Sequence, residues 1–116
     1  MVALLVALAL AGPPRATIAS GTTSVPLTIS SWCWGGRCGA PFAPSTKSLV
    51  AAPGSLVTVA LAFVPERATL SIGGRPVAAA MHGRTLSWTA TRGGGLTLRT
   101  TSARGFVTYV GRVRIR

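Results

Sequence analysis

Apolar and polar residues alternate along most of this chain, and the alternation starts at Val25. In the clearest stretch, single residues separate Val57, Val59, Leu61 and Phe63. A period of two places successive side chains on opposite faces, which is typical of a strand with one buried face. After residue 20, no segment carries the i, i+3, i+4 spacing of an amphipathic helix. The pattern therefore predicts an all-β fold.

Turn residues divide this alternation into seven or eight short strands. Gly73-Gly74, His82-Gly83 and Arg104-Gly105 each stand between two apolar stretches and predict tight hairpins. Pro26 has no N–H group, which favours a sheet edge for the first strand. The expected strands lie within residues 25–29, 49–50, 57–63, 70–72, 77–81, 86–90, 96–98 and 107–115. They predict a small antiparallel β-sandwich with Trp88 as its central core aromatic, and a closed barrel of the OB type is the alternative.

The N-terminal residues 2–11 form an unbroken apolar run, VALLVALALA. It is too short to cross a bilayer as a helix, which takes about 20 residues, but it has the length of a signal-peptide core. Pro13-Pro14 would end such a helix, and small residues suited to cleavage occur at Ala9-Leu10-Ala11 and Thr17-Ile18-Ala19. No Lys or Arg precedes the run, so an uncleaved anchor and a core strand remain alternatives.

Residues 12–24 are rich in Pro, Gly, Ser, Thr and Ala without any period, which predicts a linker. We therefore divide the chain into a signal-peptide-like segment with its linker, residues 1–20, and a β-sandwich domain, residues 21–116. An export signal would place the protein outside the cytoplasm, either secreted or in the cell envelope.

The two cysteines, Cys33 and Cys38, are separated by four residues that include Gly35-Gly36. Such a turn can bring the two side chains together, and an exported chain favours a structural disulfide there. Two cysteines are too few for a closed zinc site, and the spacing is not the C-x-x-C of redox motifs.

The charge is strongly one-sided, with twelve basic residues, a formal net charge of +11 and Glu66 as the single acid. Asp, Asn and Gln are absent, which excludes a carboxylate-rich calcium or magnesium site and paired-carboxylate catalysis. Lys47 is the only lysine. So many arginines without acids must face solvent or an anionic partner, although a GC-rich genome would produce the same composition.

Catalytic groups are scarce. His82 is the only histidine and falls in a predicted hairpin turn. A Ser–His–acid triad would have to use Glu66, and no G-x-S-x-G elbow is present. A disulfide would leave neither cysteine as a nucleophile. We therefore expect a non-enzyme without a cofactor, a metal or a small-molecule substrate.

The segment Ser55–Arg116 resembles the immunoglobulin-like modules of secreted bacterial proteins. The resemblance is carried by residues 57–63, Pro65, the Gly73-Gly74 hairpin, Trp88 and Tyr109-Val110. It implies an immunoglobulin-like sandwich, although the two cysteines are local, unlike those of antibody-type domains. The outline is also similar to that of copper-resistance periplasmic sandwiches. Their ligands are His and Met, and since only Met81 and His82 occur here, copper binding does not carry over.

Two groups of residues are candidates for binding. Trp32 and Trp34 flank Cys33 and point to one face of their strand, where Arg37 can stack on a ring. Exposed, they would form a platform for a sugar ring, a peptide or a lipid surface. The alternative is that they pack over the disulfide as a small core. The absence of Asp, Asn and Gln argues against a selective lectin.

The second candidate is the last strand, where Arg112, Arg114 and Arg116 recur at a period of two and share one face. Arg99 and Arg92 would extend this basic face if the strand 96–101 is its neighbour. The face matches a polyanion such as teichoic acid, lipid phosphate or nucleic acid, and a merely solvated face is the alternative.

Together these features favour an exported, non-catalytic binding or structural module of the cell envelope, whose basic surface contacts anionic polymer or lipid headgroups. One alternative is a small β-barrel that binds nucleic acid, against which the export-like run argues. Another is a protein partner or inhibitor of a secreted enzyme that acts through the loop Trp32–Cys38.

Overall fold

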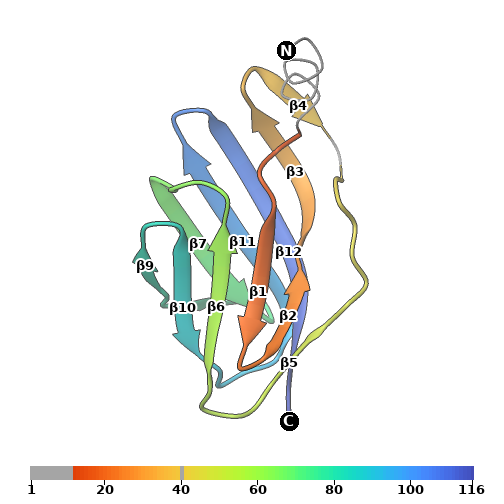
Figure 1. Ribbon diagram of the computed structural model, residues 1–116, viewed down its shortest axis with the longest axis vertical. Coiled ribbons are helices and arrows are strands. Elements are labelled where there is room, and N and C mark those ends of the chain that lie inside the picture. The colour runs from red at the N-terminus through yellow and green to blue at the C-terminus, as the bar shows by residue number, and fades with distance from the viewer. Residues whose placement is uncertain (1–11, 40) are drawn as a thin grey trace.

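The computed structural model describes residues 12–39 and 41–116, which fold into two sheets that face each other (Figure 1). The described residues contain twelve strands and no helix. Accordingly, no helix among them is long and apolar enough to cross a membrane. The strands are β1 (Ala16–Ser20), β2 (Thr23–Pro26), β3 (Thr28–Trp34), β4 (Arg37–Gly39), β5 (Leu49–Ala51), β6 (Leu56–Leu61), β7 (Arg67–Ile72), β8 (Arg75–Val77), β9 (Ala80–His82), β10 (Thr85–Thr89), β11 (Gly94–Ser102) and β12 (Gly105–Ile115).

The five-stranded sheet has the order β2-β1-β6-β10-β9, and the seven-stranded sheet has the order β4-β3-β12-β11-β7-β8. Pairing is antiparallel throughout, except that β5 runs parallel to β12 and pairs with its last residues. Each sheet keeps two separate edges among the described residues, so the fold is sandwich-like and not the closed barrel considered as the alternative.

The core lies between the two sheets and is built from the alternating apolar residues of both. Val57 and Val59 are fully buried, as the period of two predicted, and Trp88 is only 6% exposed. The largest fully buried side chain is Tyr109, at the middle of β12. Trp88 is therefore confirmed as a core aromatic, and Tyr109 is a second one.

The predicted hairpins are present. Gly73-Gly74 joins β7 to β8 with positive φ angles of 59° and 78°, which the tight turn requires and glycine adopts without strain. His82-Gly83 joins β9 to β10, and Arg104-Gly105 joins β11 to β12. Pro26 lies in β2 at an edge of the five-stranded sheet, as expected.

The expected seven or eight strands are too few. The segment 25–29 divides at the buried Leu27, where the chain passes from β2 in one sheet to β3 in the other. The segment 77–81 divides in the same way into β8 and β9. The short strand β4 was not expected, because glycine-rich residues around it resemble a loop.

The linker predicted for residues 12–24 is also wrong, because it contains β1 and the start of β2. β1 pairs with β2 on one side and β6 on the other, and its Ala16 and Ile18 are buried. The hydrophobicity pattern does not show the alternation of β1, because most of its residues are small, Thr17 and Ala19 among them. The sandwich thus includes residues before position 21. The signal-peptide-like run, residues 2–11, lies outside the described residues.

Candidate functional site

The disulfide between Cys33 and Cys38 is formed, as predicted. The two residues lie directly opposite each other in the β3–β4 hairpin. Its turn consists of Gly35 and Gly36, whose φ angles of 60° and 82° suit glycine at both central positions. The bond therefore fixes a two-stranded projection at one end of the seven-stranded sheet (Figure 1).

Trp32 and Trp34 lie in β3 on the face that points toward the other sheet, because Trp32 is opposite the fully buried Val107. Both rings are half-buried. Trp32 meets Phe42 edge-on at 6.4 Å between ring centroids, and Trp34 meets Phe63 at 4.9 Å. The two tryptophans thus extend the core beyond the end of the five-stranded sheet. They do not cover the disulfide, since Cys33 alternates to the outer face.

Cations lie over this aromatic cluster. The guanidinium carbon of Arg104 is 5.6 Å from the centre of the Trp34 ring, and that of Arg15 is 5.5 Å from the centre of the Phe42 ring. Arg37, the residue expected to stack on a tryptophan, lies opposite Trp34 in the β3–β4 pair. Sequence reasoning missed Arg104 and Arg15 because the sheets bring them to the tryptophans from distant segments.

We call this region the aromatic end. It holds five of the seven aromatic residues of the chain, the others being Trp88 and Tyr109. On the outer face, Phe106 lies opposite Cys33 and is 40% exposed. Val64, in the loop after β6, is 58% exposed. The aromatic end comprises Trp32, Trp34, Phe42, Phe63, Val64 and Phe106, with the arginines Arg15, Arg37, Arg67, Arg84 and Arg104 at the strand ends and turns around them.

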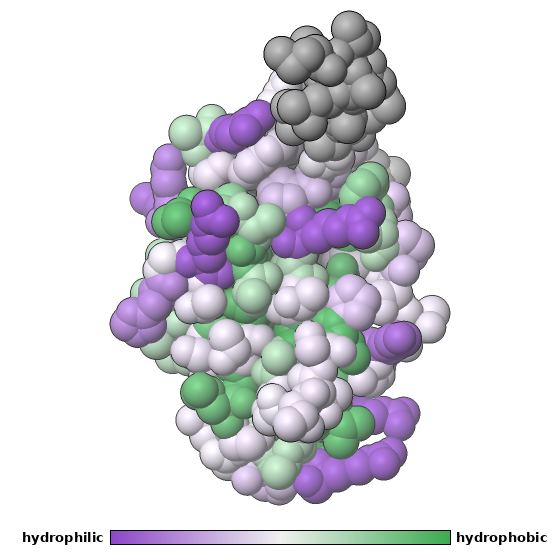
Figure 2. Space-filling model, in the orientation of Figure 1, coloured by the Kyte–Doolittle hydropathy of each residue, from purple (hydrophilic) through white to green (hydrophobic). Residues whose placement is uncertain are grey.

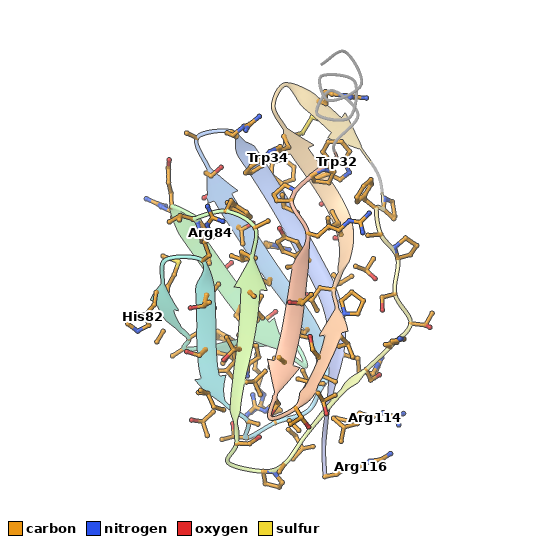
Figure 3. The ribbon with its side chains drawn as sticks, in the orientation of Figure 1. Trp32, Trp34, His82, Arg84, Arg114 and Arg116 are labelled. Carbon is orange, nitrogen blue, oxygen red and sulfur yellow. A yellow bond between two sulfur atoms is a disulfide. The ribbon has the colours of Figure 1, made fainter. Side chains whose placement is uncertain are left out.

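At the opposite end, Arg112 and Arg114 are exposed on one face of β12, Arg116 directly after the strand continues their spacing and is also exposed, and Val113 is buried. Figure 3 shows Arg114 and Arg116 near the C-terminus. We call these three residues the arginine face. Arg112 lies opposite Gly95 of β11, which has no side chain to cover it. The period of two therefore gives the expected shared face. The neighbouring strand carries no side chain at Gly95 that would cover it, so the guanidinium groups are exposed to solvent.

Arg99 and Arg92 are placed differently from the expectation. The strand that contains Arg99, β11, is indeed the neighbour of β12. Arg99 itself lies opposite Thr108, four residues along the strand from Gly95, which is about 13 Å. Arg92 precedes β11 and lies near Gly73 at the β7–β8 turn. Arg99 thus stands apart from the arginine face, and Arg92 lies at the same end of the molecule.

A cleft of about 270 Å³ adjoins Arg112. It opens where β12 has left β3 and not yet met β5, and the segment 45–48 forms its other wall. The Thr28 hydroxyl accepts a 2.7 Å hydrogen bond from the Ser45 amide and donates one of 3.2 Å to the Ser45 carbonyl. The lining residues are Thr28, Ser45, Thr46, Lys47, Ser48, Val110, Gly111 and Arg112. Four hydroxyls and two cations meet here without a carboxylate, a combination suited to an anionic, hydroxylated ligand. No pattern in the sequence indicated this cleft, because residues 45–48 carry no period.

His82 and Met81 lie in the exposed edge strand β9, where His82 points away from the sandwich (Figure 3). In the described part of the chain, no three residues of the types His, Cys, Asp and Glu gather as a metal site would require. On the visible face, strongly hydrophilic side chains lie along the sides and across the upper part, and the area over the middle of β1, β6 and β10 is pale or hydrophobic (Figure 2). The charges of this face are thus concentrated away from its centre.

Comparisons of this chain with protein-family models, with curated proteins and with solved structures give no match.

Proposed function

We propose that this protein is an exported, non-catalytic binding module of the cell envelope that holds phosphate groups of an anionic polymer or of lipid headgroups. The observation that carries the proposal is the arginine face together with the adjoining cleft. Arg112, Arg114 and Arg116 are exposed in a row, and Lys47 stands across the cleft from Arg112. With Glu66 as the only acidic side chain, these cations cannot all be neutralised within the chain.

The spacing of this row suits a repeating anion. Residues two apart on a strand are about 6.6–7 Å apart, so the arginine face spans about 13 Å. Each planar guanidinium can hold one phosphate through two hydrogen bonds. The hydroxyls of Ser45, Thr46 and Ser48 in the cleft can bond the hydroxyl groups of a sugar or polyol between phosphates. A polyol-phosphate polymer would satisfy both parts.

Export is supported by two features. The Cys33–Cys38 disulfide is compatible with an oxidising compartment, where such bonds persist. Residues 2–11 have the length and composition of a signal-peptide core. We also propose that the two facing sheets form an immunoglobulin-like sandwich, which the resemblance of residues 55–116 supports.

The proposal is tested by binding of the full chain to a purified polyol-phosphate wall polymer across a salt series. We compare Arg112→Gln/Arg114→Gln/Arg116→Gln with the equal-charge control Arg67→Gln/Arg75→Gln/Arg84→Gln. The first variant should lose affinity and show a flatter salt dependence, because fewer counterions are released. The control should bind nearly as the unmodified protein does. Equal losses in both would leave net charge as the only explanation and overturn a located site.

Two further arms separate the sources of phosphate. Phosphatidylglycerol vesicles test lipid headgroups, and a double-stranded DNA fragment tests nucleic acid. Preferential binding to DNA through Arg112, Arg114 and Arg116 would favour the nucleic-acid alternative. A protein partner engaged through the β3–β4 hairpin would give no polymer binding that depends on these arginines.

A further inference from the structure

The aromatic end offers a second surface, separate from the arginine face. Arg104 and Arg116 stand near the two ends of β12, which at about 3.3 Å per residue lie roughly 36 Å apart. That separation exceeds the screening length of about 8 Å at physiological salt, so the two groups of charges act independently.

Apolar side chains at the aromatic end are accessible to a flat surface. Phe106, on the outer face of β12, is 40% exposed, and Val64, in the loop after β6, is 58% exposed. Trp34 and Phe63 are half-buried and in contact with each other. They come from three different segments, and the disulfide and the Trp34–Phe63 contact hold two of these segments in place. An exposed, fixed apolar group can enter the boundary of a bilayer without a further cost of ordering.

Arginines surround these apolar groups. Arg15, Arg84 and Arg104 are exposed at strand ends of this region, and Arg15 and Arg104 lie over aromatic rings. The only acid, Glu66, is too little to neutralise five arginines. Tryptophan and phenylalanine beside arginine suit the interface of a membrane, because rings occupy the headgroup level while guanidinium groups bind phosphate. Anionic headgroups add an attraction that each arginine strengthens.

The path of the chain points to the same partner. β1 starts at the aromatic end, and Gly12 lies against the ring of Phe42. The apolar run of residues 2–11 immediately precedes Gly12 in the sequence. Before the run is cleaved, a bilayer that takes it up would therefore lie next to the aromatic end and not next to the arginine face.

We propose that the aromatic end rests on the surface of an anionic lipid bilayer, with Phe106 and Val64 at the headgroup boundary and Arg84 and Arg104 on lipid phosphates. The arginine face then points away from the membrane, so of the two phosphate sources proposed for it, only the polymer is within its reach on that bilayer. This inference does not depend on polymer binding, because the residues of the two surfaces are different.

The test uses the full chain and vesicles of phosphatidylglycerol whose acyl chains carry bromine, a short-range quencher of tryptophan fluorescence. Trp34 and Trp32 should be quenched, while Trp88 in the core should not, so Trp32→Phe/Trp34→Phe should remove most of the effect. Arg84→Gln/Arg104→Gln should weaken vesicle binding by roughly thirtyfold, on the basis of the attraction that each arginine contributes at an anionic surface. Phe106→Ser/Val64→Ser should reduce quenching.

The opposite end supplies matched controls. Arg75→Gln/Arg92→Gln removes the same charge there without touching the arginine face, and Val50→Ser/Leu56→Ser removes side chains that are 41% and 62% exposed. Both should leave vesicle binding nearly unchanged. In a Trp32→Phe/Trp34→Phe background, Leu56→Trp places a reporter at that end and should not be quenched. Residues 2–11 can add to vesicle binding in every variant, so binding alone does not test the proposal. The test is which end of the bound protein faces the bilayer. Quenching of the Leu56→Trp reporter equal to that of Trp34, or equal losses in the two charge pairs, would overturn the proposal.

Discussion

The hydroxyl group of Tyr109 donates a 2.7 Å hydrogen bond to the backbone carbonyl of Pro14. It joins the most buried aromatic residue of β12 to the segment that leads into β1. The N-terminal residues are thereby tied to the centre of the sandwich, which a linker would not be.

Removal of residues 1–21 is therefore expected to destabilise the fold. A chain that starts at Thr22 lacks β1, leaves β2 without its partner and exposes the edge of β6. It also loses the buried side chains of Ala16 and Ile18. Thermal unfolding followed by circular dichroism should be non-cooperative or shifted strongly to lower temperature, whereas a chain that starts at Gly12 should unfold like the full chain. A cooperative transition of unchanged midpoint in the shorter chain would show that β1 is dispensable.

If the chain is processed after export, the structure distinguishes the two sequences suited to cleavage. A cut after Ala19 would separate most of β1 from the sheet, whereas a cut after Ala11 would leave it complete. We expect the mature chain to begin at Gly12. The intact mass of the protein recovered from its host measures this, and the same spectrum reports the disulfide through the loss of two hydrogens. A mature chain that begins at Ser20 would contradict the expectation.

Alkaline pH should destabilise the protein through Tyr109. Burial raises the pKa of this phenol far above its ordinary value of about 10, because the charged form loses its hydration. The neutral, buried phenol stabilises the folded protein fully at pH values below the pKa of Tyr109 in the unfolded chain. This stabilisation is lost as pH rises from there toward the higher pKa of the folded protein. Melting temperatures should hold to about pH 10 and then fall.

Tyr109→Phe provides the control for that pH dependence, since Tyr109 is the only tyrosine. At neutral pH this variant should lose about 1 kcal/mol through the missing hydrogen bond to Pro14. Its decline above pH 10 should be shallower than that of the unmodified protein. Parallel curves for the two proteins would assign the alkaline loss to another group.

The core aromatic that the sequence predicted offers a direct stability test. Trp88 pairs with Val57 in the five-stranded sheet and is nearly fully buried. Trp88→Ala should reduce the free energy of unfolding by about 3–5 kcal/mol, the range for emptying a large core site. Trp32→Ala should cost less, because that side chain is already partly exposed to solvent. Urea titrations of both variants measure the difference, and a smaller loss at Trp88 would reverse the assignment.

The sequence predicted what local patterns determine. The alternation around Val57 and Trp88 identified buried faces, and Gly73-Gly74 identified a hairpin, because both depend on neighbouring residues alone. The contact between Arg104 and Trp34 depends on the register of β3 with β12, which no local pattern specifies. The sequence pattern did not predict β1, because small side chains such as that of Ala16 can be buried although they add little to the hydrophobicity of a segment. The disulfide was predictable, since its cysteines are close in sequence.

A single position tests the arginine face without removing an arginine. Gly95 lies opposite Arg112 on β11, and a Cβ atom added there meets no heavy atom within 4 Å. Gly95→Glu should therefore fold normally and place a carboxylate beside Arg112, where it competes with a bound phosphate. Affinity for the polyol-phosphate polymer should fall, most clearly at low salt, because the added charge is exposed and screened at high salt. Gly95→Gln has nearly the same shape without the charge and should bind as the unmodified protein does. Equal affinities of the Glu and Gln variants would mean that the polymer does not pass over Arg112, whereas equal losses would point to steric blocking and not to charge.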